Sequence, residues 1–412
     1  MSALRQLFSK QKRDARYPQQ FWLLFWGVFV NRLTVSMLWP FLTIYMYNTL
    51  GVPLATVTLL LSFRAFFSIG ATSIVSDLMD RVGRKRAMIA GMIASAVVFF
   101  GMAGGSSSLW VWAMLIAAHG AVMPIFNIGV QAMVADLIPR ENRAPAYALI
   151  RTISNAGIAI GPVIGGYLAL VSFNLVFVVV GVVFVILALL VAVILRETMP
   201  SDDANQTTDA SQRGYRFLLR DQVFISFIGL FFLMSMAYAQ IWSLLPVYLD
   251  ENFGFASNQY SLIITVNAAM VVFLQYFVTK FSDRFPPYPV ITVGAVLYAV
   301  GLYSVAWGTL LPHFMLSMAV LTIGELLVQP TAMTLVANMA PDTMRARYLG
   351  LLSLAYPVGA GVGPVVGGVL NDMIAPVAIW YGAGVMGLAS AIGFLILSHV
   401  RREKRHSLAR SA

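Results

Sequence analysis

The sequence predicts an all-α membrane protein with twelve transmembrane helices in two six-helix bundles. Of its 412 residues, 59% are hydrophobic and only 11% are charged, whereas an ordinary soluble domain carries about 25% charged residues. Apolar runs recur that could each cross about 30 Å of hydrocarbon as a helix of about 20 residues. These runs do not alternate apolar and polar residues as the strands of a membrane barrel do. The predicted fold class is therefore helical.

Twelve such runs occur, and each is expected to form one membrane span. The first is expected to be a span and not a removable signal peptide, because no short apolar core with a small-residue cleavage site leads the chain. The runs are 21–47, 54–76, 87–104, 109–134, 146–170, 174–195, 222–248, 259–280, 289–308, 313–338, 346–370 and 377–398. An even number of spans puts both termini on one side of the membrane.

Basic residues are concentrated on the side of the membrane where both termini are expected. Of the 27 Lys and Arg residues, five precede Phe21 and five follow Val400, and the loops after odd-numbered spans contain none. Cytoplasmic loops carry such an excess, so both termini are expected in the cytoplasm. Compact loops and a short linker favour a bacterial inner membrane. The net charge of +10 is thus explained by topology, and we expect no nucleic-acid partner.

A polar tract divides the spans six and six. Residues 196–221 are rich in Ser, Thr, Asp, Asn and Gln, a composition typical of a flexible linker. It separates an N-terminal bundle, 21–195, from a C-terminal bundle, 222–398. The remaining segments, 1–20 and 399–412, are expected to be a cytoplasmic N-terminal segment and a basic cytoplasmic tail.

The two halves repeat each other. GIAIGPVIGG begins at Gly157 in span five, and GAGVGPVVGG begins at Gly359 in span eleven, 202 positions later. Arg143 matches Arg345 in the same register. Parallel six-span repeats predict two bundles related by a pseudo-twofold axis along the membrane normal.

Three signatures make the chain resemble a transporter of the major facilitator superfamily over nearly its whole length. The loop after span two contains DRVGRK from Asp80, similar to the family motif G-x-x-x-D-R/K-x-G-R/K-R/K, although Ser76 replaces the leading glycine. Gly324-Glu325 followed by Pro330 in span ten is similar to a pattern of proton-coupled multidrug and peptide transporters. A run of glycines with one proline in span five resembles the motif associated with antiporters. Its residues are Gly157, Gly161, Pro162, Gly165 and Gly166.

The charged loop after span two is interpreted as a conformational latch. Topology explains its basic residues but needs no acids, so Asp77 and Asp80 call for another role. In the family that the chain resembles, this loop holds the halves or neighbouring helices together in one access state through charge pairs. The resemblance implies this role for Asp80, Arg81, Gly83 and Arg84, with Asp136 and Arg143 as partners in the loop after span four.

Arg32, Arg64 and Glu325 lie near the middle of predicted spans, where an ionised side chain costs about 2.5–3.5 kcal/mol. They should therefore face a cavity or a partner. Glu325 is the expected proton-coupling residue, because a carboxyl group in an apolar cavity can gain or lose a proton near neutral pH; the alternative is a fixed ion pair with an arginine of the other half. Arg32 and Arg64 are either structural charges paired inside the N-terminal bundle or an anion site.

Other polar and aromatic residues at similar depth are expected to line a substrate cavity. Gln329 lies one turn from Glu325, whereas His119 is interpreted as a packing residue. The cavity candidates are Asn31, Arg32, Arg64, Asn127, Gln131, Tyr238, Gln240, Trp242, Asn267 and Gln329.

The predicted function is alternating-access transport, with proton-coupled export of small amphipathic drugs or metabolites. The alternatives are a transporter or flippase for an anionic or lipid-linked substrate bound by Arg32 and Arg64, and a proton-linked peptide or metabolite importer. Neither a phosphate-binding loop nor a metal-ligand spacing is found in the sequence, so we expect no enzyme activity, cofactor or metal. The expected partners are a small-molecule substrate, protons and membrane lipids, with the protein a monomer.

Overall fold

The computed structural model describes residues 17–139, 142–198, 220–341 and 344–411. The side chains of Ser73, Ser76, Asp80, Ala144, Arg345 and Ala346, and those from residue 400 onward, also lie outside the description. Within the described part, twelve helices are long and apolar enough to span a membrane, and no strand occurs. The predicted all-α membrane fold is confirmed.

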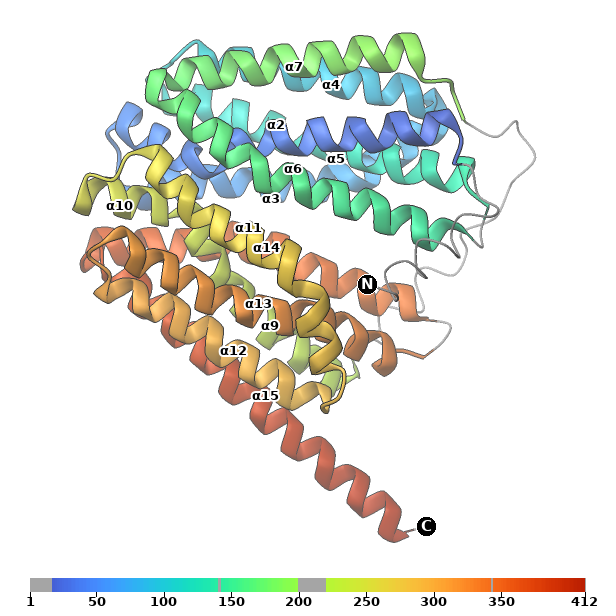
Figure 1. The fold of residues 1–412 in the computed structure, drawn as a ribbon, viewed down its shortest axis with the longest axis vertical. Coiled ribbons are helices and arrows are strands. Elements are labelled where there is room, and N and C mark those ends of the chain that lie inside the picture. Colours follow the sequence, from blue (N-terminus) through green and yellow to red (C-terminus); the bar gives the residue numbers. More distant parts are fainter. Residues whose placement is uncertain (1–16, 140–141, 199–219, 342–343, 412) are drawn as a thin grey trace.

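The helices form two bundles that lie one above the other in Figure 1. The N-terminal bundle consists of α2 (Gln19–Leu50), α3 (Leu54–Val82), α4 (Arg84–Ala103), α5 (Leu109–Leu137), α6 (Arg143–Val171) and α7 (Phe173–Ile194). The C-terminal bundle consists of α9 (Gln222–Ser243), α10 (Leu245–Phe253), α11 (Ser257–Ser282), α12 (Pro287–Ser304), η2 (Val305–Trp307), α13 (Leu311–Met339), α14 (Arg345–Met373) and α15 (Ala378–Ser411).

We call the side where α7 ends and α9 begins the linker side, and the opposite side the far side. The segments 1–20 and 196–221, which are predicted to be cytoplasmic, lie mainly outside the described residues. The segment after the last predicted span continues α15 as helix to Ser411, beyond the other helices in Figure 1.

One predicted span is interrupted. The run 222–248 was expected to be one helix, but α9 ends at Ser243 and α10 begins at Leu245. Pro246 lies in the first turn of α10. Because proline lacks an N–H group and its ring clashes with the carbonyl four residues earlier, the helix restarts there even though the sequence remains apolar.

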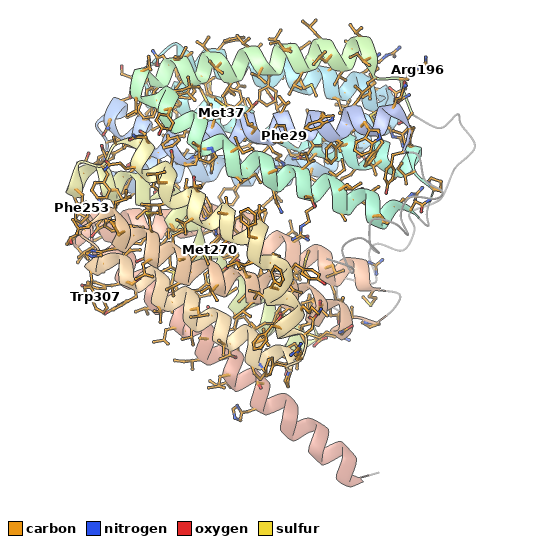
Figure 2. All side chains as sticks on the ribbon, in the orientation of Figure 1. Phe29, Met37, Arg196, Phe253, Met270 and Trp307 are labelled. Atoms are coloured by element: carbon orange, nitrogen blue, oxygen red, sulfur yellow. The ribbon has the colours of Figure 1, made fainter. Side chains whose placement is uncertain are left out.

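Large apolar side chains cover the outside of both bundles. Val193, Trp110 and Phe273 are 82%, 77% and 70% exposed, which suits contact with lipid and not with water. Figure 2 shows this covering, with Arg196 on the linker side and Phe253 and Trp307 on the far side. Each bundle also encloses its own apolar core.

Glycine stripes bring the first and fifth helices of each bundle into backbone contact. A Cβ atom added at Gly157 in α6 would lie 2.7 Å from the backbone oxygen of Phe29 in α2, and one at Gly359 in α14 would lie 3.0 Å from the backbone nitrogen of Met236 in α9. Gly161 and Gly363, one turn further, meet the same two helices. The sequence repeat is therefore also a repeat of packing.

Hydrogen bonds join the two bundles in their far halves. The backbone N–H groups of Leu54 and Ala55, at the start of α3, donate to the Asp372 carboxylate of α14 at 3.2 and 2.8 Å. The Ser261 hydroxyl of α11 donates to the Pro162 carbonyl of α6 at 2.8 Å. Nearer the middle, the Ser62 hydroxyl of α3 donates to the Gly361 carbonyl of α14. The structure is thus closed by contacts on the far side.

Candidate functional site

Two of the predicted cavity residues, Tyr238 and Asn267, meet at Glu325. This residue lies on α13, and its Oε2 atom accepts hydrogen bonds from the Tyr238 hydroxyl of α9 at 3.0 Å and from the Asn267 amide of α11 at 2.8 Å. The Asn267 amide also donates to the Thr322 hydroxyl at 2.9 Å. Tyr238 and Asn267 are buried, whereas Glu325 is half-buried. The carboxyl group is therefore held in place by groups from two other helices.

This geometry permits proton exchange without loss of position. Both donors reach Oε2, and within the described residues no hydrogen bond to Oε1 is seen. A proton on Oε1 would leave both hydrogen bonds intact, because Oε2 remains an acceptor in either protonation state. No ion pair to Glu325 occurs in the described part of the chain, so the fixed ion pair considered above is not observed in this conformation.

Aromatic rings surround the Glu325 cluster. The ring of Tyr238 lies 5.9 Å from that of Trp242, 5.3 Å from that of Tyr298 and 6.1 Å from that of Tyr356, and Gln329 interacts with Tyr298. Tyr298, Tyr356 and Thr322 are not among the residues predicted from the sequence, although tyrosines inside spans were a usable signal.

Gln240 lies apart from this cluster. Its side chain is fully buried, with the amide nitrogen 3.8 Å from the Met386 sulfur of α15. It therefore packs inside the C-terminal bundle and does not face the Glu325 carboxyl.

In the N-terminal bundle, Arg64 lies on an aromatic ring. Its guanidinium carbon is 3.1 Å from the centre of the Trp39 ring, a cation–π contact. Trp39 is in turn stacked on His119, with ring centres 6.4 Å apart, and His119 is only 4% exposed. Gly120 allows the close approach of α5 to α3, because a Cβ there would lie 2.5 Å from the Arg64 carbonyl oxygen. His119 thus packs as predicted, and it helps to position Arg64 through Trp39.

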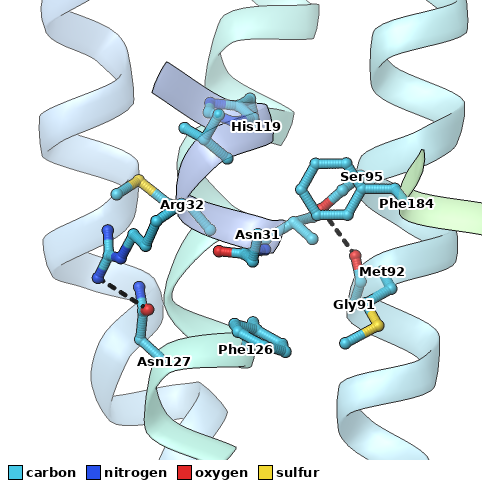
Figure 3. Close-up of a pocket in the computed structure, with 12 residues that line it drawn as sticks. Asn31, Arg32, Gly91, Met92, Ser95, His119, Phe126, Asn127 and Phe184 are labelled. Atoms are coloured by element: carbon cyan, nitrogen blue, oxygen red, sulfur yellow. Dashed lines mark hydrogen bonds between the residues drawn. The ribbon is translucent and has the colours of Figure 1, made fainter. Parts of the chain in front are cut away.

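Arg32, Asn31 and Asn127 come together in a second polar site (Figure 3). The Arg32 guanidinium donates to the Asn127 side-chain oxygen at 2.9 Å. The cavity beside them has a volume of about 20 Å³, which is room for one or two water molecules. This space is too small for an amphipathic substrate. Gln131, one turn beyond Asn127, is exposed.

Arg32 and Arg64, inside the spans of the N-terminal bundle, have no acidic partner among the described residues. Glu325 is the single acidic residue in the twelve predicted spans, and no ion pair to Arg32 or Arg64 occurs among the described residues. Pairing with an acid inside the N-terminal bundle, one of the two interpretations above, is therefore not observed at this depth among the described residues. The sequence already contained this signal, because acids can be counted span by span.

The predicted latch residues form contacts on the linker side. Arg84 Nε lies 3.0 Å from Asp136 Oδ2, with the two side chains 12% and 18% exposed. The backbone N–H groups of Arg84 and Lys85 both donate to the Glu197 carboxylate at 3.1 Å. Thr198 also donates to Asp136, at 2.8 Å. These contacts join α4, α5 and the segment after α7, all in the N-terminal bundle.

The other latch candidates differ in their surroundings. Arg143 donates to the carbonyls of Ile138 and Ala135 at the end of α5, at 3.0 and 2.5 Å, and so binds backbone groups there. Gly83 has a φ of +98°, a backbone conformation that favours glycine, and a Cβ there would lie 2.6 Å from the Glu197 carboxylate, so that side chain would have to move. Asp77 and Arg81 are exposed, and the Asp80 side chain lies outside the description.

Comparison with known proteins agrees with this architecture. The sequence profile of the Major Facilitator Superfamily matches residues 24–256 and 230–412. The chain is 26% identical over 388 residues to a Na(+), Li(+), K(+)/H(+) antiporter of Planococcus maritimus, covering 87% of this chain and 89% of that protein. It is 25% identical over 403 residues to the multidrug resistance protein MdtH of Yersinia pestis, covering 97% and 99%.

Solved structures share the fold. The nucleoside transporter NupG superposes with a TM-score of 0.75 at 18% identity, over 92% of this chain and 99% of that one. A POT family transporter, solved in complex with a thioalcohol-conjugated peptide, superposes with a TM-score of 0.75 at 14% identity, over 92% and 96%.

Proposed function

The chain belongs to the major facilitator superfamily and is a multi-pass membrane transporter, not an enzyme, and we propose that it exchanges protons for small amphipathic molecules that it exports. Glu325 is the proton-carrying group in this proposal. Transport proceeds by alternating access, in which the two bundles rock about a site between them.

The observation that carries the proposal is the state of Glu325. It is the one acidic residue in the twelve predicted spans, and it is held by Tyr238 and Asn267 through Oε2. A half-buried carboxyl group without an ionic partner can change its protonation state at modest energetic cost, whereas one in a buried ion pair cannot. This arrangement suits a residue that binds a proton on one side of the membrane and releases it on the other.

The far-side contacts support a cytoplasm-facing place in the proposed cycle for this conformation. The distribution of Lys and Arg predicts that the linker side is cytoplasmic, in a bacterial inner membrane. The hydrogen bonds of Asp372 and Ser261 then close the outside, and proton release from Glu325 would be to the cytoplasm. Opening to the outside requires these contacts to break while the two bundles approach each other on the linker side.

Two similarities support the choice of exchange and export. A relative is described as a cation/H(+) antiporter and another as a multidrug resistance protein. The glycine stripe of α6 resembles the motif of antiporters. Its copy in α14 makes equivalent contacts, so the stripe acts through close packing in both halves.

The test uses the purified protein in liposomes with an imposed pH gradient. Lumenal pH is recorded while cationic drugs, anionic metabolites and peptides are added in turn. We expect a subset of compounds to trigger proton movement, and Glu325→Gln to abolish it, because the amide cannot carry the proton. The matched control is Asp283→Asn, which makes the same kind of change, from an acid to its amide, at an exposed position on the linker side.

Two results would contradict the proposal. Full gradient-driven transport by Glu325→Gln at equal protein content would remove Glu325 from coupling. Substrate flux without any proton movement would identify a uniporter or a flippase of the same fold.

A further inference from the structure

We propose that the substrate carries a negatively charged group and that the guanidinium of Arg64, lying on Trp39, binds it. This inference rests on the proposed transport function and adds the charge class of the substrate. The ligand chemistry is that of an amphipathic anion, with a carboxylate, sulfonate or phosphate group beside an apolar or aromatic body.

Arg64 is fixed in position before any ligand arrives. Its guanidinium carbon is 3.1 Å from the centre of the Trp39 ring, and Trp39 is itself stacked on the buried His119. The backbone of Arg64 is held against Gly120 of α5. A planar guanidinium that is already oriented loses little conformational freedom on binding a carboxylate or phosphate.

The charge of Arg64 is uncompensated. The six predicted spans of the N-terminal bundle contain no acid, and within the described residues no ion pair to Arg64 is formed. A cation at this depth is unfavourable unless something offsets its loss of hydration, and the cation–π contact offsets only part of that loss. An anionic substrate would supply the missing counter-charge.

Arg64 also lies where the two bundles meet. Two residues earlier on α3, Ser62 bonds to Gly361 of α14, which closes the far side. Tyr356 of α14 lies near both Arg64 and Glu325, and its ring lies 6.1 Å from that of Tyr238. Both Arg64 and Tyr356 remain partly exposed. An anion on Arg64 would therefore lie beside the aromatic wall that leads to the proton site.

This placement predicts selectivity against cations. A positively charged amphipathic molecule would be repelled by Arg64. The Glu325 carboxyl group would attract it only when deprotonated, because the protonated group is neutral. An anion would be attracted to Arg64 in both protonation states of Glu325. Opposite charge at a fixed site attracts one ligand sign and rejects the other.

The test measures binding of three probes that share one ring system: 2-naphthoate, 2-naphthylmethanol and 2-naphthylmethylammonium. The full chain is placed in phosphatidylcholine nanodiscs, and binding is measured by equilibrium dialysis against empty nanodiscs. We expect 2-naphthoate to bind about tenfold or more tightly than the amine, the factor expected from one charge-assisted hydrogen bond.

Three variants assign the preference. Arg64→Gln should remove it, Arg64→Lys should keep part of it, and Arg151→Gln, which changes an exposed arginine of the same bundle, should leave it intact. Size-exclusion profiles confirm that each variant is folded. Equal or tighter binding of the amine by the unmodified protein would overturn the proposal, as would an unchanged preference in Arg64→Gln.

A further arm separates two sources of the anion. Lysophosphatidylglycerol is added as a competitor, because a lipid head group offers the same negative charge as a soluble acid. Displacement of 2-naphthoate that depends on Arg64 would indicate a lipid-linked substrate, and its absence would indicate a water-soluble anion. Glu325→Gln should keep the anion preference. The proposal of proton coupling and the proposal of anion binding can therefore be refuted independently.

Discussion

The N-terminal and C-terminal bundles are alike in packing and unlike in buried charge. The glycine stripes of α6 and α14 contact α2 and α9 in the same way, 202 positions apart. The ionisable residues do not follow this repeat, because 202 positions after Arg64 comes Val266, and 202 positions before Glu325 comes Met123. Duplication has thus conserved the backbone contacts that let helices approach, while each half carries its own chemistry. We infer that the N-terminal half binds the substrate charge and the C-terminal half binds the proton.

The largest expected effect tests the shared packing. Gly165 and Gly367 are equivalent positions, but a Cβ at Gly165 would meet the backbone of Met37, whereas a Cβ at Gly367 would meet only side chains, those of Leu244 and Gln240. Gly165→Ala should lower the free energy of unfolding by about 3 kcal/mol and Gly367→Ala by about 1 kcal/mol, because side chains can move and backbone cannot. Unfolding in mixed micelles with increasing dodecyl sulfate measures both.

Gly350→Ala is the matched control for this pair. Gly350 lies on α14 with no atom within 4 Å of an added Cβ, so alanine there should be neutral or slightly stabilising in a helix. Equal losses at positions 165 and 367 would contradict the distinction between backbone and side-chain contact.

An intermediate effect is expected at the far side, where the halves are capped differently. The start of α3 is capped by Asp372 of the other bundle. The equivalent start of α11 is capped within its own bundle, because the backbone N–H of Ala256 donates to the Gln259 side chain at 2.9 Å. Asp372→Asn should weaken far-side closure by about 1 kcal/mol, since it removes the negative charge at a helix N-terminus.

The chain contains no cysteine, so spin labels at Ser107→Cys and Leu310→Cys report the far-side distance between the bundles. A loss of about 1 kcal/mol corresponds to a roughly fivefold shift toward the longer distance. Asp283→Asn, an exposed change on the linker side, should not shift the distribution. An unchanged distribution in Asp372→Asn would show that this cap does not hold the far side closed.

The smallest expected effect concerns the linker side. The first N–H groups of α4 donate to Glu197, whereas α12 begins with Pro287, which has no N–H group to cap. Glu197→Gln should therefore lower the free energy of unfolding by about 0.5–1 kcal/mol, because the amide caps the helix N-terminus less strongly than the carboxylate. The comparison is again Asp283→Asn, on the same side of the C-terminal bundle, which should have no effect. An equal loss in both variants would point to general surface charge and not to the cap.

The sequence predicted the helices, the repeat and three of the polar residues that the structure brings together in the C-terminal bundle. Glu325, Tyr238 and Asn267 were selected separately because a polar group inside an apolar span needs a partner, and the structure brings them together. The break before Pro246 was not predicted, because the hydropathy of that run does not change there.

Contacts between distant segments could not be predicted. Glu197 is 113 residues from Arg84, and Asp372 is 317 residues from Ala55. Both acids lie near helix ends and match no local pattern, and a helix N-terminus accepts a carboxylate from anywhere in the chain. The contact between Arg64 and the Trp39 ring could not be predicted either, because cation–π contacts have no characteristic spacing in the sequence.

The central claim is that Glu325 binds and releases a proton inside the membrane. Infrared difference spectroscopy on the reconstituted protein tests it most directly, since a protonated carboxyl group has its own C=O stretching band. The account predicts that acidification produces a carboxylic-acid band in the unmodified protein that is missing from Glu325→Gln and retained in Asp372→Asn. Identical bands in the unmodified protein and Glu325→Gln would contradict it, because Glu325 would then not change its protonation state.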